Sequence, residues 1–406
     1  MKKLTAFTLV FALLLGGCAP ASAGTENLME DVPDRVICLA ETPDCTTQAT
    51  DFALRLFQKS LEEGKNTLVS PLSVLSALAM TTNGAECNTL SQMEETLGAP
   101  ISDWNAYLYS FLDGQADSLK LANSIWFKDA PSLEICPEFL ETNADFFQSD
   151  IFRTPMDHTT PEAINTWVRE KTGGTIPKLV DKVEPQTLMY LINALAFEAE
   201  WEDIYDETQI WEGTFTAADG TQQSAEFMSS KESLYLEDEN ATGFLKYYAG
   251  RDYAFVALLP REGVSVADYV SSLTGEHLQE LLEDPEQITT YAMLPKFETE
   301  YDLDMIEILI DMGMTDAFDP ALADFTRLGN SKDGNIFIGK ILHKTYLSVA
   351  EQGTKAGAAT VVEIVCGAAL IQDYREVNLD RPFVYMLIDC EQNLPFFIGT
   401  VMDLEN

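Results

Sequence analysis

The sequence is poor in histidine and in basic residues. Its 406 residues include 3 histidines, and 25 Lys and Arg stand against 66 Asp and Glu, which gives a formal net charge of −41 at pH 7. Nucleic acids and heparin bind proteins through clustered Lys and Arg, so we expect neither of them as a partner. The simplest interpretation of the acidity is that it keeps an exported protein soluble.

The seven cysteines form no metal-binding pattern. The chain has no Cys-x-x-Cys pair and no histidine cluster beside a cysteine, so we expect no zinc or other metal site and no cofactor. Cys38 and Cys45 are close enough along the chain to close a small disulfide loop, which is the one pairing that the spacing suggests. A reaction that uses histidine as a general base must use His158, His277 or His343.

One apolar run occurs at the start of the chain, and no second run of membrane length follows it. Two lysines precede residues 4–15, which are too few to span a bilayer and are typical of a cleaved export signal. Two cleavage sites remain open. Residues 15–18 are typical of a bacterial lipobox, in which Cys18 carries a lipid and becomes the N-terminus, whereas residues 21–23 are typical of an ordinary signal-peptidase site.

We favour the lipobox, because a cysteine directly after the apolar run needs a reason to be there. Residues 1–23 are interpreted as a signal peptide. The mature protein is then expected outside the cell or at the cell surface, in contact with the bacterial membrane only through its N-terminal lipid.

The rest of the chain divides into a polar segment and one large domain. Residues 24–49 are polar, contain two prolines and lack apolar periodicity, so we expect a flexible tether there. From residue 50 to residue 406 helical patterns come mostly early and strand-like runs late, which is typical of an α+β protein. Helices are expected over 51–61, 71–83, 164–171 and 269–282, and strands over 188–195, 253–259, 336–349, 383–388 and 396–404.

A run of small residues follows the strand expected at 336–349. Residues 351–360 read EQGTKAGAAT, and residues 361–370 read VVEIVCGAAL. Composition alone permits an exposed flexible loop or a buried strand of glycine and alanine. The run nevertheless resembles the proximal hinge of the reactive-centre loop in serpins, a family of serine protease inhibitors.

Seven further motifs resemble serpin motifs and occur in the order of that family. Any one of them could arise by chance, but the likeness extends over residues 50–406. The motifs are NTLVSPLS at 66–73, LANSIWF at 121–127, INTWV at 164–168, LINA at 191–194, LPKF at 294–297, HK at 343–344 and VNLDRPFVYML at 377–387.

The chain is identified as a member of the serpin superfamily by these motifs. The resemblance implies an α+β serpin fold with three β-sheets, eight or nine helices and an exposed reactive-centre loop. It also implies a monomer that acts as a suicide inhibitor of serine proteases and not as an enzyme. The protease attacks the loop, an acyl-enzyme forms, and the loop inserts into the main sheet and traps it.

The hinge has the side chains that insertion needs. A loop that becomes a central strand presents every second side chain to the core, where an unpaired charge is costly. The charged Lys355 would point outward, and Gly357, where the family favours alanine, would cost the strand only ~0.5–1 kcal/mol. The hinge residues that the resemblance implies are Glu351, Gly353, Thr354, Ala356, Ala358 and Thr360.

Two counts place the bond that the protease attacks. Fourteen residues on from the hinge glycine, the family spacing gives the bond between Gly367 and Ala368, whereas counting back from Pro382 gives Ile371. We favour the first, because the length of the inserted strand is mechanically constrained. The window from Ile364 to Ile371 holds no Arg or Lys, so we expect serine proteases that accept small apolar residues, as elastase-like and subtilisin-like proteases do.

The resemblance also assigns five residues to the centre of the main sheet. They are Ser70, Ser73, Asn193 and His343 for the shutter, a polar cluster beneath the strands that separate, and Trp201 for the breach, where insertion begins. Glu198 and Glu200 depart from the family, which usually has lysine and glycine there, and this puts the local ion pairing in doubt.

Two rival functions remain open. A non-inhibitory serpin that acts as a binding protein would be cleaved as a plain substrate. A surface hydrolase would use Ser70 and His343 as nucleophile and base, although no Gly-x-Ser-x-Gly motif and no orienting carboxylate accompany them.

Overall fold

The computed structural model describes residues 24–405, except residues 34, 36, 38, 40, 117 and 355–372. Within this part of the chain, nine α-helices and three β-sheets of eight, nine and two strands are present. The prediction of an α+β fold with three sheets and eight or nine helices is confirmed. The reactive-centre loop of that prediction lies outside the described residues.

Several helices begin or end at residues that favour a terminus. Pro71 and Pro137 start α2 and α5, where the first N–H groups of a helix have no partner inside it. Gly98, with φ 85°, ends α3. The helices are α1 Thr46–Ser60, α2 Pro71–Thr82, α3 Cys87–Leu97, α4 Ile101–Asp113, α5 Pro137–Phe147, α6 Thr160–Lys171, α7 Val266–Ser272, α8 Gly275–Glu283 and α9 Ile306–Asp311.

Two helix predictions are wrong in their bounds. The run at 269–282 forms two helices, α7 and α8, because the Thr274 hydroxyl accepts a hydrogen bond from the backbone N of His277 at 3.2 Å and starts a new helix. Helix α1 starts at Thr46 rather than near residue 51, since Ala49 already belongs to the buried core. Helix α1 therefore begins inside the segment 24–49.

The first sheet contains the long strands β6 and β15, which pair with each other in parallel. Its strands follow the order β1-β5-β3-β6-β15-β16-β7, and β13 also pairs with β15. Their bounds are β1 Glu26–Asn27, β3 Leu119–Lys128, β5 Asp150–Thr154, β6 Met189–Phe197, β7 Ala199–Glu200, β13 Phe297–Asp304, β15 Lys340–Ala350 and β16 Gly353–Thr354.

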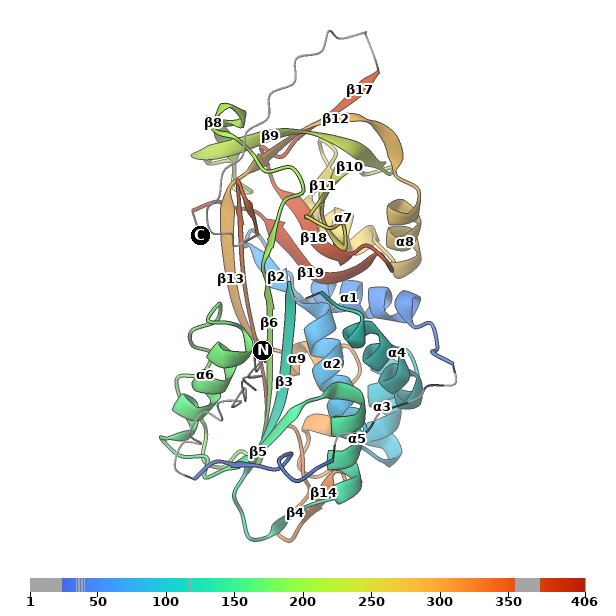
Figure 1. Ribbon diagram of the computed structural model, residues 1–406, viewed down its shortest axis with the longest axis vertical. Helices are drawn as coiled ribbons and strands as arrows, with labels where there is room; N and C mark the ends of the chain where they lie inside the picture. Colours follow the sequence, from blue (N-terminus) through green and yellow to red (C-terminus); the bar gives the residue numbers. More distant parts are fainter. Residues whose placement is uncertain are drawn as a thin grey trace, which may run out of the picture.

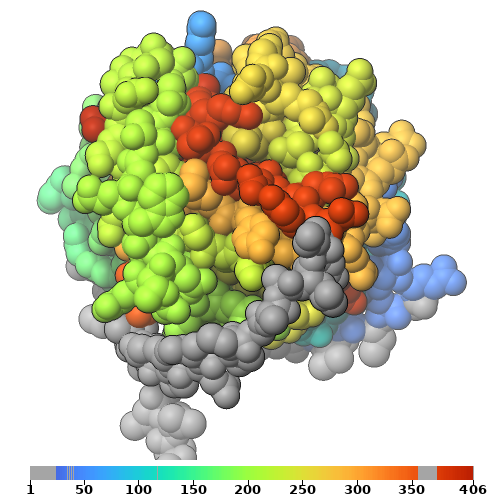
Figure 2. Space-filling model, turned by 90° about the horizontal axis from the view of Figure 1, so that it is seen from above, coloured from blue at the N-terminus to red at the C-terminus, as the bar shows by residue number. Residues whose placement is uncertain are grey.

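The second sheet forms the upper half of the molecule in Figure 1, and Figure 2 looks down on it. Its order is β17-β12-β9-β10-β11-β18-β19-β2, and β8 pairs with β9. The bounds are β2 Thr67–Val69, β8 Ile210–Thr216, β9 Gln222–Glu237, β10 Ala241–Tyr247, β11 Tyr253–Pro260, β12 Glu286–Pro295, β17 Tyr374–Asn378, β18 Phe383–Asp389 and β19 Leu394–Val401, and the small third sheet pairs β4 Leu133–Ile135 with β14 Gly329–Ser331.

The five predicted strands correspond to β6, β11, β15, β18 and β19, with ends that differ by a few residues. Alternate side chains of β6 face different layers. Ile192 and Ala194 pack with Ile164 of α6 in one core cluster, whereas Asn193 bonds to Ser73 of α2. Helices α6 and α2 lie on opposite sides of the long strands (Figure 1).

The segment that we expected to be a flexible tether is held along a sheet edge over part of its length. Residues Glu26–Asn27 form β1, which pairs with β5, and Leu28 N donates to Ile151 O at 2.8 Å. Arg153 also pairs with Glu26 at 2.9 Å. A strand of two residues shows no periodicity in the sequence, so the polar composition alone misled the prediction. No helix of the described part is long and apolar enough to cross a membrane.

Candidate functional site

The chain reverses direction where the predicted hinge begins. Strand β15 ends at Ala350, and two residues later the chain returns as β16. Thr354 pairs with Val349 on one side and with Ala199 on the other, so β16 lies between β15 and β7. Gly353 has φ 152°, and a Cβ on it would lie 2.1 Å from the carbonyl O of Ala199. Only glycine fits this close approach.

Thr354 faces the core. Its side chain is 1% exposed, and its Oγ1 lies 2.6 Å from the hydroxyl of Tyr248. Burial raises the pKa of the Tyr248 hydroxyl, which stays protonated. This is the orientation that the alternation predicts for Thr354. The hinge residues Ala356, Ala358 and Thr360 lie outside the described residues.

Trp201, the predicted breach residue, holds this reversal in place. Its indole Nε1 donates to Ala350 O at 2.8 Å, and its backbone N donates to Gln352 O at 2.9 Å. Its ring stacks on the ring of Tyr248 with centroids 4.4 Å apart. Trp201 therefore contacts both the turn and the side chain that binds Thr354.

A buried lysine lies beside these rings, and the sequence analysis missed it. Lys246 is 1% exposed, and its Nζ lies 3.1 Å from Glu232 Oε1 and 3.1 Å from Asp203 O. The Nζ also lies 4.6 Å from the ring centre of Tyr205 and 5.5 Å from that of Trp201. Its charge is thus both paired and held against aromatic faces. Nothing in the sequence around β10 marks this lysine as buried.

An ion pair fixes the other side of the reversal. Lys296 Nζ lies 3.0 Å from Glu351 and 3.3 Å from Glu226. The Glu351 carboxylate accepts a hydrogen bond from its own backbone N–H and pairs with Lys296, and both contacts lower its pKa. Glu351 was predicted as a hinge residue, but its partner was not.

Glu198 is one of the departures from the family pattern. It accepts a hydrogen bond from Thr175 Oγ1 at 2.7 Å.

The four predicted shutter residues form one buried network between α2, β6 and β15. His343 on β15 is paired with Asn193 on β6, and His343 Nδ1 lies 3.0 Å from Asn193 Oδ1. The backbone N of Ser70 donates to His343 Nε2 at 3.1 Å. Ser73 is hydrogen-bonded to Asn193, whose amide also donates to Asn123 Oδ1 at 2.6 Å. These contacts tie the two strands to the helix beneath them.

The network fixes which nitrogen of His343 carries the proton. Because Nε2 accepts from a backbone N–H, Nδ1 carries the proton and donates it to Asn193 Oδ1. Burial lowers the pKa of His343 from 6.5 to about 3, so the ring is neutral near pH 7. A neutral hydrogen bond therefore joins β6 to β15 in the core.

Comparison with known proteins decides the family. Residues 47–404 match the family model described as Serpin (serine protease inhibitor).

The chain belongs to the serpin family.

Its similarity to individual serpins extends over most of the chain. Leukocyte elastase inhibitor of Bos taurus is 30% identical over 86% of this chain and 97% of that protein. Tengpin, a thermophilic serpin, is 43% identical in its native state, with a TM-score of 0.90 over 94% of this chain and all of tengpin (100%). The latent state of tengpin gives a TM-score of 0.79 at 44% identity, over 90% and 100%. The described residues are thus more similar to the native state than to the latent state.

The geometry of this serpin argues against the hydrolase alternative. Among the described residues, Ser70 Oγ has no hydrogen-bond partner, and it is the backbone N of Ser70 that meets His343. Both side chains are buried. A catalytic serine must contact its base and its substrate, so these residues have a structural role.

The cysteine predictions depend on residues outside the described part of the chain. Cys45 has a buried free thiol, and its suggested partner Cys38 lies outside the described residues. Cys18 lies outside them as well, as does the predicted reactive bond between Gly367 and Ala368. In the described ranges no group of His, Cys, Asp and Glu residues could hold a metal ion.

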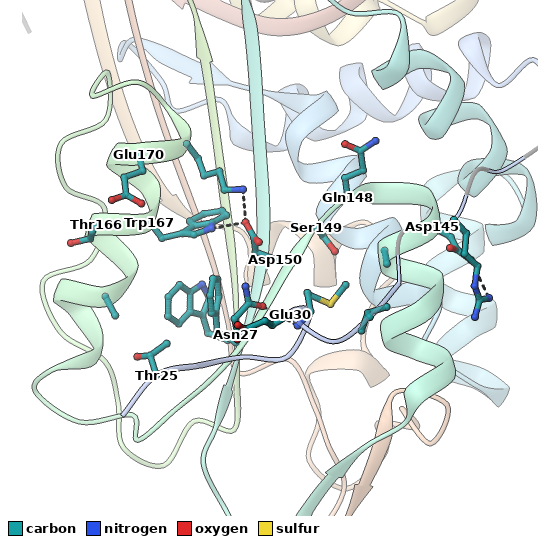
Figure 3. Close-up of a pocket in the computed structure, with 18 of the residues that line it drawn as sticks. Thr25, Asn27, Glu30, Asp145, Gln148, Ser149, Asp150, Thr166, Trp167 and Glu170 are labelled. Carbon is teal, nitrogen blue, oxygen red and sulfur yellow. Dashed lines mark hydrogen bonds and ion pairs between the residues drawn. The ribbon is translucent and has the colours of Figure 1, made fainter. Parts of the chain in front are cut away.

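A cavity of about 1100 Å³ lies away from the hinge, between α5, α6, β5 and the N-terminal segment (Figure 3). Trp167 Nε1 donates to Asp150 Oδ2 at 2.8 Å, and Lys171 pairs with the same carboxylate at 2.6 Å. These polar groups satisfy one another across the wall of the cavity. The residues that line the cavity do not include those of the hinge site.

We expect this serpin to lose stability in acid through His343. Its pKa is 6.5 unperturbed and about 3 in the folded protein. The contribution of the neutral ring is therefore complete above pH 6.5 and falls by ~1.4 kcal/mol per pH unit as the pH drops toward about 3. Thermal unfolding between about pH 7 and pH 4.5 measures this loss. His343→Gln removes the titrating group, and an equally steep pH dependence in that variant would contradict the assignment.

We expect Tyr248→Phe to loosen β16, because Thr354 Oγ1 is left buried without its partner at a cost of ~1–3 kcal/mol. Thr354→Val removes the other half of the same hydrogen bond. In urea unfolding, the double variant should lose less free energy of unfolding than the two single losses together, with a coupling of ~0.5–1.5 kcal/mol. Strictly additive losses would show that the two hydroxyls do not interact.

Proposed function

We propose that this serpin inhibits serine proteases by inserting its cleaved reactive-centre loop into the first sheet, between β6 and β15. The position of β16 supports this most directly. Gly353 and Thr354 already lie between β15 and β7, with the small, uncharged side chain of Thr354 in the core. The first residues of an inserted strand are thus in place before any cleavage.

The strand register indicates where the following residues would go. In the closed part of the sheet His343 lies opposite Asn193, and at the hinge Val349 and Ala199 flank Thr354, so the offset between the strands stays the same. An antiparallel strand that continued from Thr354 would meet an earlier residue of β15 at each step. The expected pairs on the core side are Ala356 with Leu347, Ala358 with Thr345 and Thr360 with His343.

All three of these β15 side chains are buried, so the side chains opposite them would also face the core. The ladder between β6 and β15 ends at Lys344 and Ala194. Residues 355–358 would enter the stretch above this ladder. The residues after them would have to break the ladder and the hydrogen bond between His343 and Asn193.

The chemistry of inhibition belongs to the protease. Its serine attacks the loop, at the bond between Gly367 and Ala368 in our assignment, and forms an acyl-enzyme. Insertion of about fourteen residues at ~3.3 Å each moves the tethered protease by ~45 Å. A displacement of catalytic groups by only ~1 Å can lower a rate about a hundredfold. Deacylation therefore stalls, and the serpin contributes no acid, base or nucleophile.

The targets that we propose are elastase-like or subtilisin-like proteases. The window from Ile364 to Ile371 lacks Arg and Lys, so a protease that requires a basic residue finds none there. The similarity to a bovine protein named leukocyte elastase inhibitor supports the same class. The rival function, a non-inhibitory serpin that is cleaved as a substrate, makes the opposite prediction in the experiment below.

We expect the purified protein to form a covalent complex with such a protease, because trapping leaves the acyl bond intact. A denaturing gel should show a boiling-resistant band at the summed mass, and the mass of the released C-terminal peptide identifies the cleaved bond. Clean cleavage between residues 364 and 371 without this band, with both protease types, would exclude inhibition and leave the non-inhibitory alternative.

The chain offers a matched pair of variants for the same experiment. In the proposed register Ala358→Glu places a carboxylate in the core opposite Thr345, where it has no partner, whereas Ala359→Glu places the same group on the outer face. Ala358→Glu should be cleaved as a substrate, because insertion is slowed and deacylation is complete before the protease is trapped. At least about tenfold more inhibitor should then be consumed per protease. The second should remain close to the wild type, and equal effects of both variants would contradict the register.

We further propose that the protein is exported and held at the membrane surface by a lipid on Cys18. The lipobox pattern at residues 15–18 supports this assignment. Cys18→Ser should abolish labelling by a radioactive fatty acid and release the protein from the membrane fraction. An N-terminus at residue 24 in the wild-type protein would instead identify the ordinary signal-peptidase site.

A further inference from the structure

Exposed aromatic side chains gather on one face of the second sheet. Four large apolar side chains are exposed in the described part of the chain, and three of them lie on this face: Trp211 at 47%, Tyr291 at 42% and Tyr374 at 54%. They come from β8, β12 and β17, and β9 lies between β8 and β12. In Figure 2 the green strands β8 and β9, the orange β12 and the red β17 lie side by side on the face seen from above.

These side chains form one continuous surface. Trp211 stacks on Phe227 of β9, and its Nε1 donates to Ser229 Oγ at 3.0 Å. Lys231 follows Ser229 by two positions on β9 and lies opposite Tyr291 of β12. Its Nζ lies 5.3 Å from the centre of the Tyr291 ring.

Tyr291 in turn packs edge-to-face against Tyr374, with centroids 5.4 Å apart. We call Trp211, Lys231, Tyr291 and Tyr374 the aromatic patch. Each of its members lies on a paired strand, so the backbone beneath the patch is already ordered before a partner binds.

The aromatic patch combines the ring side chains that are typical of protein interfaces with one lysine, and the exposed Glu376 lies opposite Tyr291 on β17. Tryptophan and tyrosine dominate the binding energy of interfaces because they bury a large area with few rotatable bonds. The patch presents Lys231 as a cation in a chain of net charge −41. A complementary partner offers apolar side chains to the rings and a carboxylate to Lys231.

The sequence distance from the predicted reactive bond determines which partner reaches the aromatic patch. Tyr374 follows Ala368 by six positions, and even a fully extended chain of six residues spans only ~20–22 Å. A protease of about 220 residues has a radius of gyration of ~17 Å. A protease that holds the loop at this bond therefore brings its own surface over β17 and β12.

We infer that the aromatic patch is a second contact surface for the body of the target protease, beside the loop itself. The inference rests on the proposed function and extends it to a named surface. Contacts at the patch prolong the first, non-covalent complex, so that acylation competes better with dissociation. The patch raises the speed of inhibition and leaves the trapping step unchanged.

Trp211→Ala and Tyr291→Ala test this inference with an elastase-like or subtilisin-like protease that the wild-type protein inhibits. Each variant should lower the second-order rate constant of inhibition by about tenfold or more, as for residues that dominate an interface. The covalent band and the amount of inhibitor consumed per protease should stay as in the wild type. Leu322→Ala is the matched control, because Leu322 is 58% exposed but lies outside the patch.

Rate constants within about twofold of the wild type in both patch variants, with normal covalent bands, would overturn the inference and leave the proposed function intact. Absence of the band in the wild-type protein would overturn the proposed function instead. The patch is then still tested by binding to a protease whose catalytic serine is replaced by alanine. Its dissociation constant should rise about tenfold or more for Trp211→Ala, and an unchanged value would overturn the inference.

Discussion

The incomplete pairing of β6 with β15 is the constraint on which the rest of the structure depends. From Lys340 to Lys344, β15 forms a parallel ladder with β6. At the hinge, the reversed segment β16 lies between β15 and β7. Backbone groups inside a sheet need hydrogen-bond partners. A segment with suitable side chains that enters between these strands therefore gains a ladder on each side. Thr354 has already done so, and Gly353 is the residue that lets the chain approach Ala199 closely enough.

In the proposed mechanism the buried network around His343 opposes further insertion. A strand that advances past residue 358 must break the hydrogen bond between His343 and Asn193, and each group left without a partner in the core costs ~1–3 kcal/mol. The cost is transient in the proposed register, because Thr360 would arrive opposite His343 with a hydroxyl that can replace the lost partner. The network thus controls how fast the sheet opens more than how stable the opened sheet is.

The resemblance to serpins located most of this site, because its members occupy recognisable motifs. It supplied the network of Ser70, Asn193 and His343 and placed Trp201 at the hinge. The residues that bind to these positions from other strands, above all Tyr248 and Lys246, were missed, since a cross-strand contact leaves no periodic trace in the sequence. The early start of α1, the break between α7 and α8 and the short edge strand β1 were missed for a related reason. Each depends on a capping bond, on burial against a distant element or on pairing with a distant strand.

The same geometry limits how strong any second contact with a protease can be. A protease that acylates at the loop and is then carried ~45 Å must give up every contact that it made near the loop. Binding energy at the aromatic patch accelerates capture, and it must be weak enough to leave the movement that follows unhindered. A very tight surface would slow insertion and give deacylation time to release the protease. The exposure of Trp211, Tyr291 and Tyr374, each near one half, indicates a shallow surface rather than a deep pocket. Such a surface holds a partner long enough for acylation and releases it at modest cost.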